Sequence, residues 1–247
     1  MKVLGIDIGG TGVKGAPVES RTGELLAPRL RIATPQPATP EALAKTVAQV
    51  TAHFKWKGPV GCGVPGVVRH GKLYTAAHLA PECIGADIRA AFEQESGCTF
   101  TVINDGDAAG LAEMRLGAGK GRKGVVFLCT LGTGIGTALF VDGVLVPNTE
   151  LGHIEVRGKD AELRAAESAR IRKNLSWKRW AARVDEYLSL MQAYLWPELI
   201  VVGGGVSQKH EKFLPLLTVD TEVAPAQMRN EAGIVGAALA AAEAGRK

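Results

Sequence analysis

Apolar and small residues alternate along the chain from Val3, which predicts a β-strand that runs into a turn at Asp7. Two further short segments with the same character follow, Ala16–Glu19 and Arg29–Ile32. The polar segment Arg21–Glu24 lies between them and has the composition of a turn. The start of the chain is therefore expected to form a three-stranded meander.

A helical period replaces the strand period after the proline-rich loop Thr34–Pro40. Thr39 is in position to cap a helix that has Pro40 in its first turn and extends to about Phe54. Apolar residues at helical spacing predict three more helices, at Asp87–Ser96 with Gly97 as the C-cap, at Ala108–Leu116 and at Ser176–Leu195. The tryptophans of the last of these are expected to lie in a core.

Four continuous apolar runs predict buried strands, at Val60–Val68, Phe100–Ile103, Val125–Cys129 and Leu199–Val202. Polar groups follow the second run as Asn104–Asp105, where open α/β sheets place their binding sites. Asp105 could accept a proton from a substrate hydroxyl. Alternatively, Asn104 and Asp105 only cap the next helix. The Pro65–Gly66 turn in the first run either holds a substrate or merely reverses the chain.

The turn after the first strand has the chemistry of an anion-binding loop. Gly9 and Gly10 let backbone N–H groups approach an anion, while Thr11 adds a hydroxyl and Lys14 a positive charge. Asp7 could reach a magnesium ion or its waters. The alternative is a β-hairpin with a glycine-rich tip and Asp7 as a turn residue. The loop matches neither the Walker sequence nor the dinucleotide-binding glycine pattern.

A second turn of glycine and threonine lies within Thr130–Phe140, again directly after a predicted strand. Its chemistry is similar to that of the first turn. Two such loops facing each other would hold a phosphate chain between them.

Composition fits a globular protein with a sizeable core. The chain has 247 residues, 46% of them hydrophobic and 22% charged, and no apolar run long enough to cross a bilayer. The cysteines are Cys62, Cys83, Cys98 and Cys129, and none forms a C-x-x-C pair. This spacing disfavours a zinc site or a disulfide framework and predicts a cytoplasmic protein. A net charge of +4 permits an anionic substrate without requiring nucleic acid.

The two glycine turns, Asn104–Asp105 and the sequence Glu150–His153 together resemble the sugar kinases of the ROK family. The resemblance covers nearly the whole chain and implies the actin-like, ribonuclease H-like fold of two α/β domains that flank a cleft. We expect a smaller domain of residues 1–106 plus 232–247, with the first phosphate loop and sugar-side residues. Residues 107–231 would form the larger domain, with the second phosphate loop and the E-x-G-H motif.

Two further segments, Thr34–Pro40 and Arg229–Ala238, are similar to the polyphosphate glucokinases within that family. This resemblance implies transfer of a phosphoryl group from inorganic polyphosphate, ATP or both to the 6-hydroxyl of glucose. It also implies Mg²⁺ as cofactor, a homodimer, and neither nucleic acid nor a membrane as partner. A kinase for mannose or N-acetylglucosamine remains an alternative. A sugar-sensing regulator is disfavoured because those proteins carry an N-terminal helix-turn-helix, whereas a strand begins here at residue 2.

The resemblance also implies roles for individual residues. Asp105 matches the general base, and the sugar would be bound by Asn104, Asp105, Glu150, His153, Glu162 and Gly66. The first phosphate loop comprises Asp7, Gly9, Gly10, Thr11 and Lys14, with Asp7 holding Mg²⁺ directly or through water. The second comprises Gly132, Thr133 and Gly134, and the nucleotide would lie at Gly203, Gly204 and Gly205.

Many relatives carry a zinc knuckle of one histidine and three cysteines after the E-x-G-H motif. The segment Ile154–Ala166 has no cysteine, so His153 is expected to be free to face the sugar.

Basic residues gather in two places outside these motifs. One set is Lys120, Arg122 and Lys123, and the other is Arg170, Arg172, Lys173, Lys178, Arg179 and Arg183. Both are by default solvated surface, and the second set could alternatively bind nucleic acid. In a polyphosphate enzyme, the same charges could line a track for a long polyanion.

Overall fold

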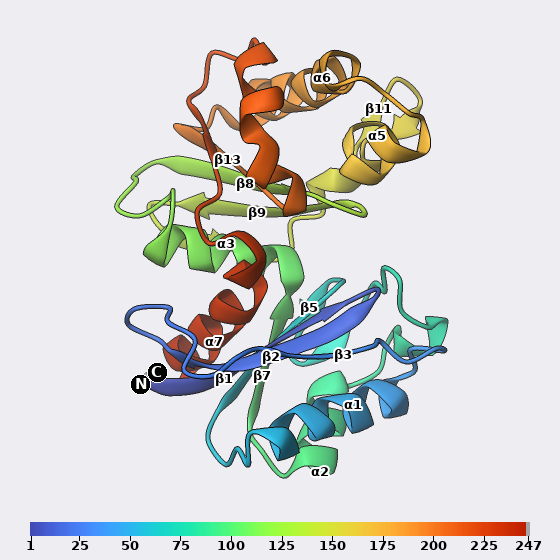
Figure 1. Cartoon of the computed structure of the whole chain (residues 1–247), viewed down its shortest axis with the longest axis vertical. Helices are drawn as coiled ribbons and strands as arrows, with labels where there is room; N and C mark the ends of the chain where they lie inside the picture. Colours follow the sequence, from blue (N-terminus) through green and yellow to red (C-terminus); the bar gives the residue numbers. More distant parts are fainter. Residues whose placement is uncertain (246–247) are drawn as a thin grey trace. The chain divides into compact units, whose positions relative to one another are not determined.

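The computed structural model describes residues 1–245. The chain divides into two compact units (Figure 1), which are described separately below. The first comprises Met1–Ala112 and the C-terminal segment from Glu231, and the second comprises Glu113–Asn230. The sequence motifs place the division at 106/107 instead. The start of helix α3 belongs to the first unit because Ala108 packs directly against Gly236 of that unit.

The first unit is built on a five-stranded sheet of order β3-β2-β1-β4-β7. Its antiparallel half is the predicted meander, and its parallel half consists of the predicted buried strands. The strand bounds are β1 (Lys2–Gly9), β2 (Gly12–Glu19), β3 (Leu30–Ile32), β4 (Val60–Val64) and β7 (Phe100–Asn104). A small hairpin of β5 (Val68–Arg69) and β6 (Lys72–Leu73) and the short helix η1 (Pro81–Cys83) lie between β4 and the next helix.

Helices cover both faces of this sheet (Figure 1): α1 (Pro40–His53) and α2 (Ile88–Ser96) lie on one face, and α7 (Ala232–Ala244) on the other. Helix α1 begins as predicted, since Ala42 N–H donates to Thr39 Oγ1 at 3.3 Å. Helix α2 ends as predicted at Gly97, whose φ of 70° is left-handed.

Helix α7 packs against the sheet backbone to backbone. A Cβ atom placed on Gly5 of β1 would lie 2.0 Å from the carbonyl oxygen of Ile234. On the helix side, a Cβ atom on Gly236 would lie 1.6 Å from the carbonyl oxygen of Ala108. Neither approach leaves room for a side chain, so the glycines at both positions are required by packing.

The second unit repeats the arrangement of the first. Its five-stranded sheet has the order β10-β9-β8-β13-β14, antiparallel from β10 to β8 and parallel from β8 to β14. The bounds are β8 (Val125–Leu131), β9 (Ile135–Val141), β10 (Val144–Val146), β13 (Leu199–Gly203) and β14 (Val223–Pro225). The long helix α6 (Trp177–Leu195) begins at Ser176, whose Oγ accepts from Arg179 N–H at 3.3 Å. Trp180 is fully buried in this unit's core, as predicted.

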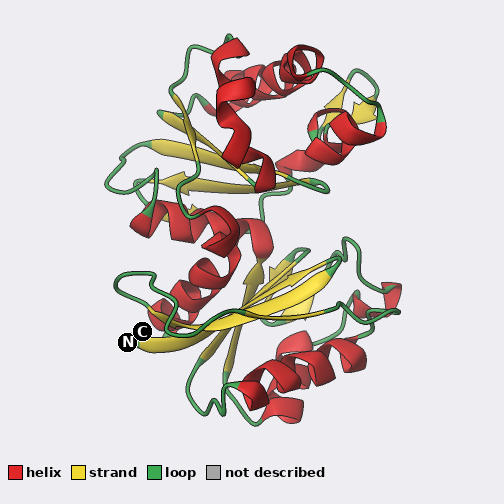
Figure 2. Cartoon of the chain, in the orientation of Figure 1, coloured by secondary structure: helices red, strands yellow, loops and turns green. Residues whose placement is uncertain are grey.

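Short elements complete the second unit (Figure 2). Between β10 and α6 lie η2 (Leu151–His153), β11 (Glu155–Val156), β12 (Lys159–Asp160), α4 (Glu162–Ala165) and α5 (Glu167–Arg172). After β13 follow η3 (Gly205–Lys212) and η4 (Leu214–Leu216), and η5 (Arg229–Glu231) precedes α7. Among the described residues, no helix combines the length and apolar character that a membrane span needs.

Three predicted boundaries are wrong by three residues or more. Strand β2 begins at Gly12 rather than Ala16, because it pairs with β1 up to the tip of the hairpin. The strand from Val60 ends at Val64 rather than Val68, because Pro65 has no N–H to donate and Gly66 has a φ of 152°. Helix α3 (Asp105–Leu116) begins three residues before Ala108. Its first turn is closed by Asn104, whose Oδ1 accepts from Asp107 N–H at 3.0 Å.

Candidate functional site

The first glycine turn is the tip of the β1–β2 hairpin. Gly9 pairs with Gly12, and Gly10 and Thr11 form the tip. Asp7 is a strand residue paired directly with Lys14, and Lys14 Nζ lies 3.1 Å from Asp7 Oδ2. The hairpin alternative is therefore correct, but its placement of Asp7 in the turn is wrong. A hairpin tip can still bind an anion, because its N–H groups and Lys14 remain beside it.

Two polar side chains anchor this tip. Thr34, from the proline-rich loop, donates its hydroxyl proton to the carbonyl oxygen of Gly9 at 2.5 Å. Arg31 of β3 donates from Nη2 to the carbonyl oxygen of Thr11 at 2.9 Å. The turn is therefore held from outside the hairpin, which preorganises it for a ligand. Arg31 lies outside the sequence motifs and Thr34 lies within one, but neither contact with the loop was predicted, because both side chains reach it through backbone carbonyls.

Asp7 lies beside the first turn of α7. A Cβ atom on Gly233 would lie 2.9 Å from Asp7 Cγ and 3.0 Å from Asp7 Oδ1. The same Cβ atom would lie 3.2 Å from Asp7 Oδ2, which is also hydrogen-bonded to Lys14, so no side chain fits between position 233 and the carboxylate. A cation or its water ligand fits this chemistry, and the side chain of Asp7 is 18% exposed.

Asn104 and Asp105 occupy the end of β7 and the start of α3. Asn104 is buried, caps α3 through Oδ1 and donates from Nδ2 to the carbonyl oxygen of Gly66 at 3.1 Å. The structure thus brings Asn104 and Gly66 together, and it confirms the capping alternative for Asn104. Asp105 Oδ1 accepts from Gly106 N–H at 2.8 Å, and its carboxylate is only partly buried.

In the second unit, the turn from Gly132 to Gly134 joins β8 to β9. Ser168 of α5 holds it at two points: Ser168 N–H donates to the carbonyl oxygen of Gly132 at 3.0 Å, and Ser168 Oγ donates to that of Thr133 at 2.6 Å. A Cβ atom on Gly134 would lie 2.3 Å from Glu162 Oε2, whereas one on Gly132 would meet no atom within 4 Å. The turn is therefore packed by protein on one side and open on the other.

The segment Gly203–Gly205 lies at the same edge of the sheet as this turn. Gly203 pairs with Thr130 near the end of the neighbouring strand β8. Gly204 has a φ of 85°, and a Cβ atom there would lie 2.7 Å from the carbonyl oxygen of Leu131. The second phosphate turn and the predicted nucleotide segment thus come together within this unit.

The E-x-G-H motif is fixed to β9 by its glycine and by a buried threonine. A Cβ atom on Gly152 would lie 2.0 Å from the carbonyl oxygen of Ile135, so only glycine fits. Thr137 Oγ1 accepts from Leu151 N–H at 3.2 Å and hydrogen-bonds the carbonyl oxygen of Thr149. These contacts fix the backbone that carries Glu150 and His153.

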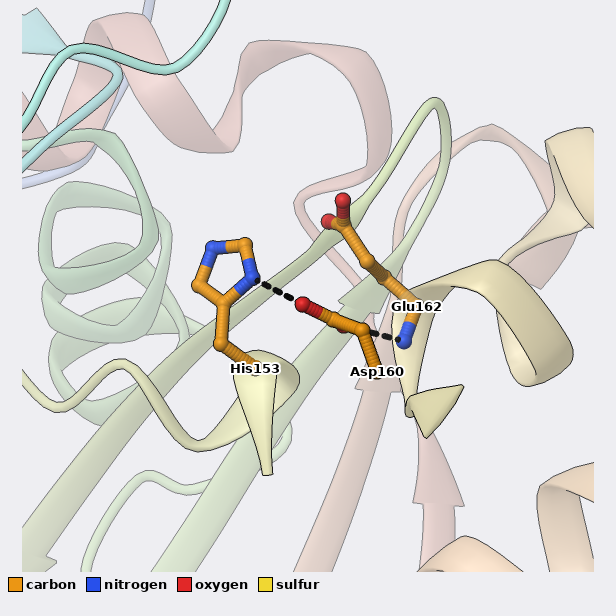
Figure 3. A group of neighbouring side chains, drawn as sticks. All are labelled: His153, Asp160 and Glu162. Atoms are coloured by element: carbon orange, nitrogen blue, oxygen red, sulfur yellow. Dashed lines mark hydrogen bonds and ion pairs between the residues drawn. The ribbon is translucent and has the colours of Figure 1, made fainter. Parts of the chain in front are cut away.

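His153 has polar partners within its own unit, and that its imidazole faces the sugar stays a prediction. Its Nδ1 lies 2.9 Å from Asp160 Oδ2, and its Nε2 lies 3.6 Å from Glu150 Oε2 (Figure 3 shows the first contact). Asp160 also accepts from Glu162 N–H at 3.1 Å. The hydrogen bond to Asp160 raises the pKa of His153 above its ordinary value, and the charges of Glu162 and Glu150 add to this effect. Burial raises the pKa of Glu150.

The ligand atoms of His153, Asp160 and Glu162 lie within 4.8 Å of one another, close enough to surround a cation. In the structure, however, they bond to each other and to the backbone. Asp160 was missed by the sequence motifs. The only signal that could have found it is its place two residues before Glu162, where an aspartate commonly caps a short helix.

The two sets of basic residues differ in position. Lys120, Arg122 and Lys123 precede β8, whereas the glycine turn follows it. A strand of seven residues separates them, a length of about 20 Å. Arg122 is also paired with Glu222 at 2.5 Å. By contrast, α5, which carries Arg170 and Arg172 of the second set, contacts the glycine turn directly through Ser168.

The repeated sheet topology, with a glycine turn after the first strand of each sheet, defines the class of protein: an α/β protein of the actin-like ATPase fold. The model of the ROK family matches residues 3–165. The chain therefore belongs to the ROK family.

Several known proteins are similar over nearly the whole chain. The polyphosphate glucokinase of Mycobacterium tuberculosis strain CDC 1551 is 49% identical over 238 residues, which cover 96% of this chain and 90% of that protein. The crystal structure of an inorganic polyphosphate/ATP-glucomannokinase from Arthrobacter sp. strain KM is 47% identical, with a TM-score of 0.94 and 98% and 99% coverage. A ROK glucokinase from Streptomyces griseus, in complex with glucose and AMPPNP, shares the fold at 23% identity, with a TM-score of 0.84 and coverage of 98% and 100%.

Proposed function

We propose that the chain is a glucokinase that transfers a phosphoryl group from inorganic polyphosphate and ATP to the 6-hydroxyl of glucose. One observation carries this proposal: identity of 47–49% to two proteins named for this chemistry, over at least 96% of the chain. The chain's own residues support it, because the predicted base and the E-x-G-H motif are built on rigid elements of the fold.

Asp105 is the general base of this proposal. Phosphoryl transfer to an alcohol needs positioning, neutralisation of charge and one group that accepts the hydroxyl proton. Asp105 starts α3 at the end of a parallel strand, and its carboxylate is partly exposed. Asn104 and Gly66 position it, and Glu150, His153 and Glu162 supply hydrogen-bonding groups for the sugar.

The glycine turns bind the donor phosphates. The first offers backbone N–H groups at Gly9, Gly10 and Thr11 beside Lys14, and the second offers those of Gly132–Gly134. The segment Gly203–Gly205 lies beside the second turn and binds the nucleotide when ATP is the donor. Mg²⁺ would be held at Asp7, directly or through water, and supplies positive charge to the phosphates.

The test is a coupled assay of the purified chain with glucose and polyphosphate, ATP or no donor. We expect glucose-dependent turnover with each donor and none without. No turnover with either donor would refute the proposal. Turnover with ATP alone would limit the phosphoryl donor to ATP. Mannose is a second acceptor to compare by kcat/KM, because the similar Arthrobacter protein is named a glucomannokinase.

Two further properties belong to this proposal. A homodimer is expected from the family resemblance, and light scattering of the purified chain would measure it. A cytoplasmic location accords with four cysteines that are buried as free thiols.

A further inference from the structure

Four cations of the second unit lie close enough to Lys173, the residue after α5, to act on its charge. We call them, together with Lys173, the α5 cluster, and its members are Lys159, Arg164, Arg172, Lys173 and Arg183. They come from β12, α4, α5, the residue after α5, and α6. Lys173 Nζ lies 3.4 Å from the carbonyl oxygen of Leu163, so its side chain folds back over α4.

The α5 cluster has an excess of positive charge. Loss of solvation lowers the pKa of Lys173, and the charges of Arg183, Lys159, Arg172 and Arg164 lower it further. Only Arg164 has a carboxylate partner, Glu186 at 2.7 Å, and Glu186 is shared with Arg157. Among residues 1–245, the other four members form no ion pair with a carboxylate.

An unsatisfied donor accompanies this charge. Arg183 Nη1 is buried and has no hydrogen-bond partner within the described residues, and the same holds for Arg164 Nε. Arg170, outside the cluster, also has a buried Nε without a partner among these residues, but its charge is paired: it lies 3.7 Å from Glu167 and stacks 4.1 Å from the ring of Trp177. A merely solvated basic face would not leave guanidinium N–H groups buried and unpaired.

Helix α5 connects this charge to the second phosphate turn. Its residue Ser168 holds Gly132 and Thr133, and Arg172 ends the same helix. Arg172 follows Ser168 by four positions along the helix, which corresponds to a rise of about 6 Å. A phosphate chain bound at the turn therefore has cations within a short distance along this helix.

We propose that the α5 cluster binds the part of a polyphosphate chain that extends beyond the phosphates at the second glycine turn. This inference rests on the proposed function for the identity of the ligand. Nucleic acid is the other polyanion that a basic face could bind, but contact with the phosphate turn favours polyphosphate. Each cation that meets a phosphate releases counterions, so the affinity should increase with chain length and fall steeply with salt.

The test uses the full chain and two double variants of equal charge. Arg172→Ala/Lys173→Ala removes two exposed members of the α5 cluster. Lys120→Ala/Lys123→Ala removes the same charge at the opposite end of β8 and is the matched control. Binding of long-chain polyphosphate, tripolyphosphate and a single-stranded oligonucleotide is measured by calorimetry across a salt series. The KM values for polyphosphate and ATP are measured in parallel.

We expect the cluster variant to bind long-chain polyphosphate about tenfold more weakly, with a salt slope reduced by about 1.5 to 2 because two cations are removed. Its ratio of KM for long-chain polyphosphate to KM for ATP should rise about tenfold, whereas the control should keep the wild-type ratio. The preference of the wild-type chain for long polyphosphate over tripolyphosphate should shrink in the cluster variant only.

Several results would overturn this inference. One is an equal loss of polyphosphate affinity in both variants, and another is an equal loss of affinity for long-chain polyphosphate and tripolyphosphate in the cluster variant. The others are no binding of polyphosphate by the wild-type protein, or tighter binding of the oligonucleotide than of polyphosphate. The two proposals fail separately. Absence of glucose phosphorylation with any donor contradicts the glucokinase assignment, while the binding measurement tests the α5 cluster without turnover.

Discussion

His153 Nδ1 and Asp160 Oδ2 lie 2.9 Å apart, and this contact fixes the imidazole of the E-x-G-H motif. An ionised carboxylate can only accept, so Nδ1 carries a proton. Nε2 then lies on the side of Glu150. The carboxylate of Asp160 thus determines that Nε2 is the ring nitrogen available to a ligand, since the hydrogen bond made by one ring nitrogen of a histidine fixes the state of the other.

Replacing Asp160 with Asn should lower the pKa of His153. The hydrogen bond to Asp160 is the main cause of the raised pKa, while Glu150 and Glu162 remain to raise it in part. Because the pKa is raised by folding, the pair stabilises the protein at pH values below the ordinary histidine pKa. That contribution is lost as pH rises through the folded-state value. NMR titration of the His153 ring measures the change, and an unaltered pKa would show that Asp160 does not control this histidine.

Replacing Asp105 with Asn should lower kcat by about two or more orders of magnitude and leave the fold intact. The amide oxygen of Asn can still accept from Gly106 N–H, so the start of α3 is preserved. Asp142→Asn is a matched control, because Asp142 makes a similar backbone contact, from Gly124 N–H at 2.9 Å, in a turn of the second unit. Near-normal turnover of Asp105→Asn, or an equal loss in both variants, would refute the role of base.

Because one side of the second glycine turn is open, a substitution there should weaken donor binding without lowering the stability of the protein. Gly132→Ala places a methyl group where no protein atom lies within 4 Å, so thermal stability should be nearly unchanged. If donor phosphates occupy that space, the KM for polyphosphate and that for ATP should both rise, by about tenfold each. Unchanged KM values for both donors would place the phosphates elsewhere.

Gly134→Ala is the contrasting variant at this turn. Its methyl group would overlap Glu162 Oε2, so the substitution must displace that side chain. The KM for glucose should therefore rise, because Glu162 is the proposed sugar ligand. If Gly134→Ala leaves the glucose KM unchanged while calorimetry shows a folded protein, Glu162 does not bind the sugar.

Gly236→Ala should destabilise the first unit by about 1–3 kcal/mol, since the added methyl group would overlap the carbonyl of Ala108. Gly245→Ala is the control: its Cβ atom would lie 3.7 Å from the nearest atom, an ordinary contact. Thermal unfolding of the two variants measures the difference. Equal midpoints would mean that α7 can move away from α3 at little cost.

Local features of the sequence were sufficient to predict where α1, α2 and α6 begin. Thr39 and Ser176 cap helices through contacts three residues away, and such contacts can be inferred from the sequence alone. The start of α3 was predicted three residues late, because Asp105, Gly106 and Asp107 have low helix propensity.

Longer-range relations could not be predicted. The contact of His153 with Asp160 depends on the β11–β12 hairpin, which brings residues seven apart together. Which basic residues lie near a phosphate turn depends on the end of β8 at which each segment lies. From composition alone, Lys123 and Lys173 are equally good candidates to bind a phosphate. In the fold, Lys123 lies at the start of β8, whereas Lys173 follows α5, which contacts the glycine turn at the end of β8.

The most direct test of the account is NMR identification of the product formed from glucose by the purified chain with polyphosphate or ATP. If the chain is a glucokinase with Asp105 as its base, glucose 6-phosphate should form with each donor. The Asp105→Asn variant should form almost no glucose 6-phosphate in the same time. No phosphorylated glucose with either donor, or a product phosphorylated at another hydroxyl, would contradict the account.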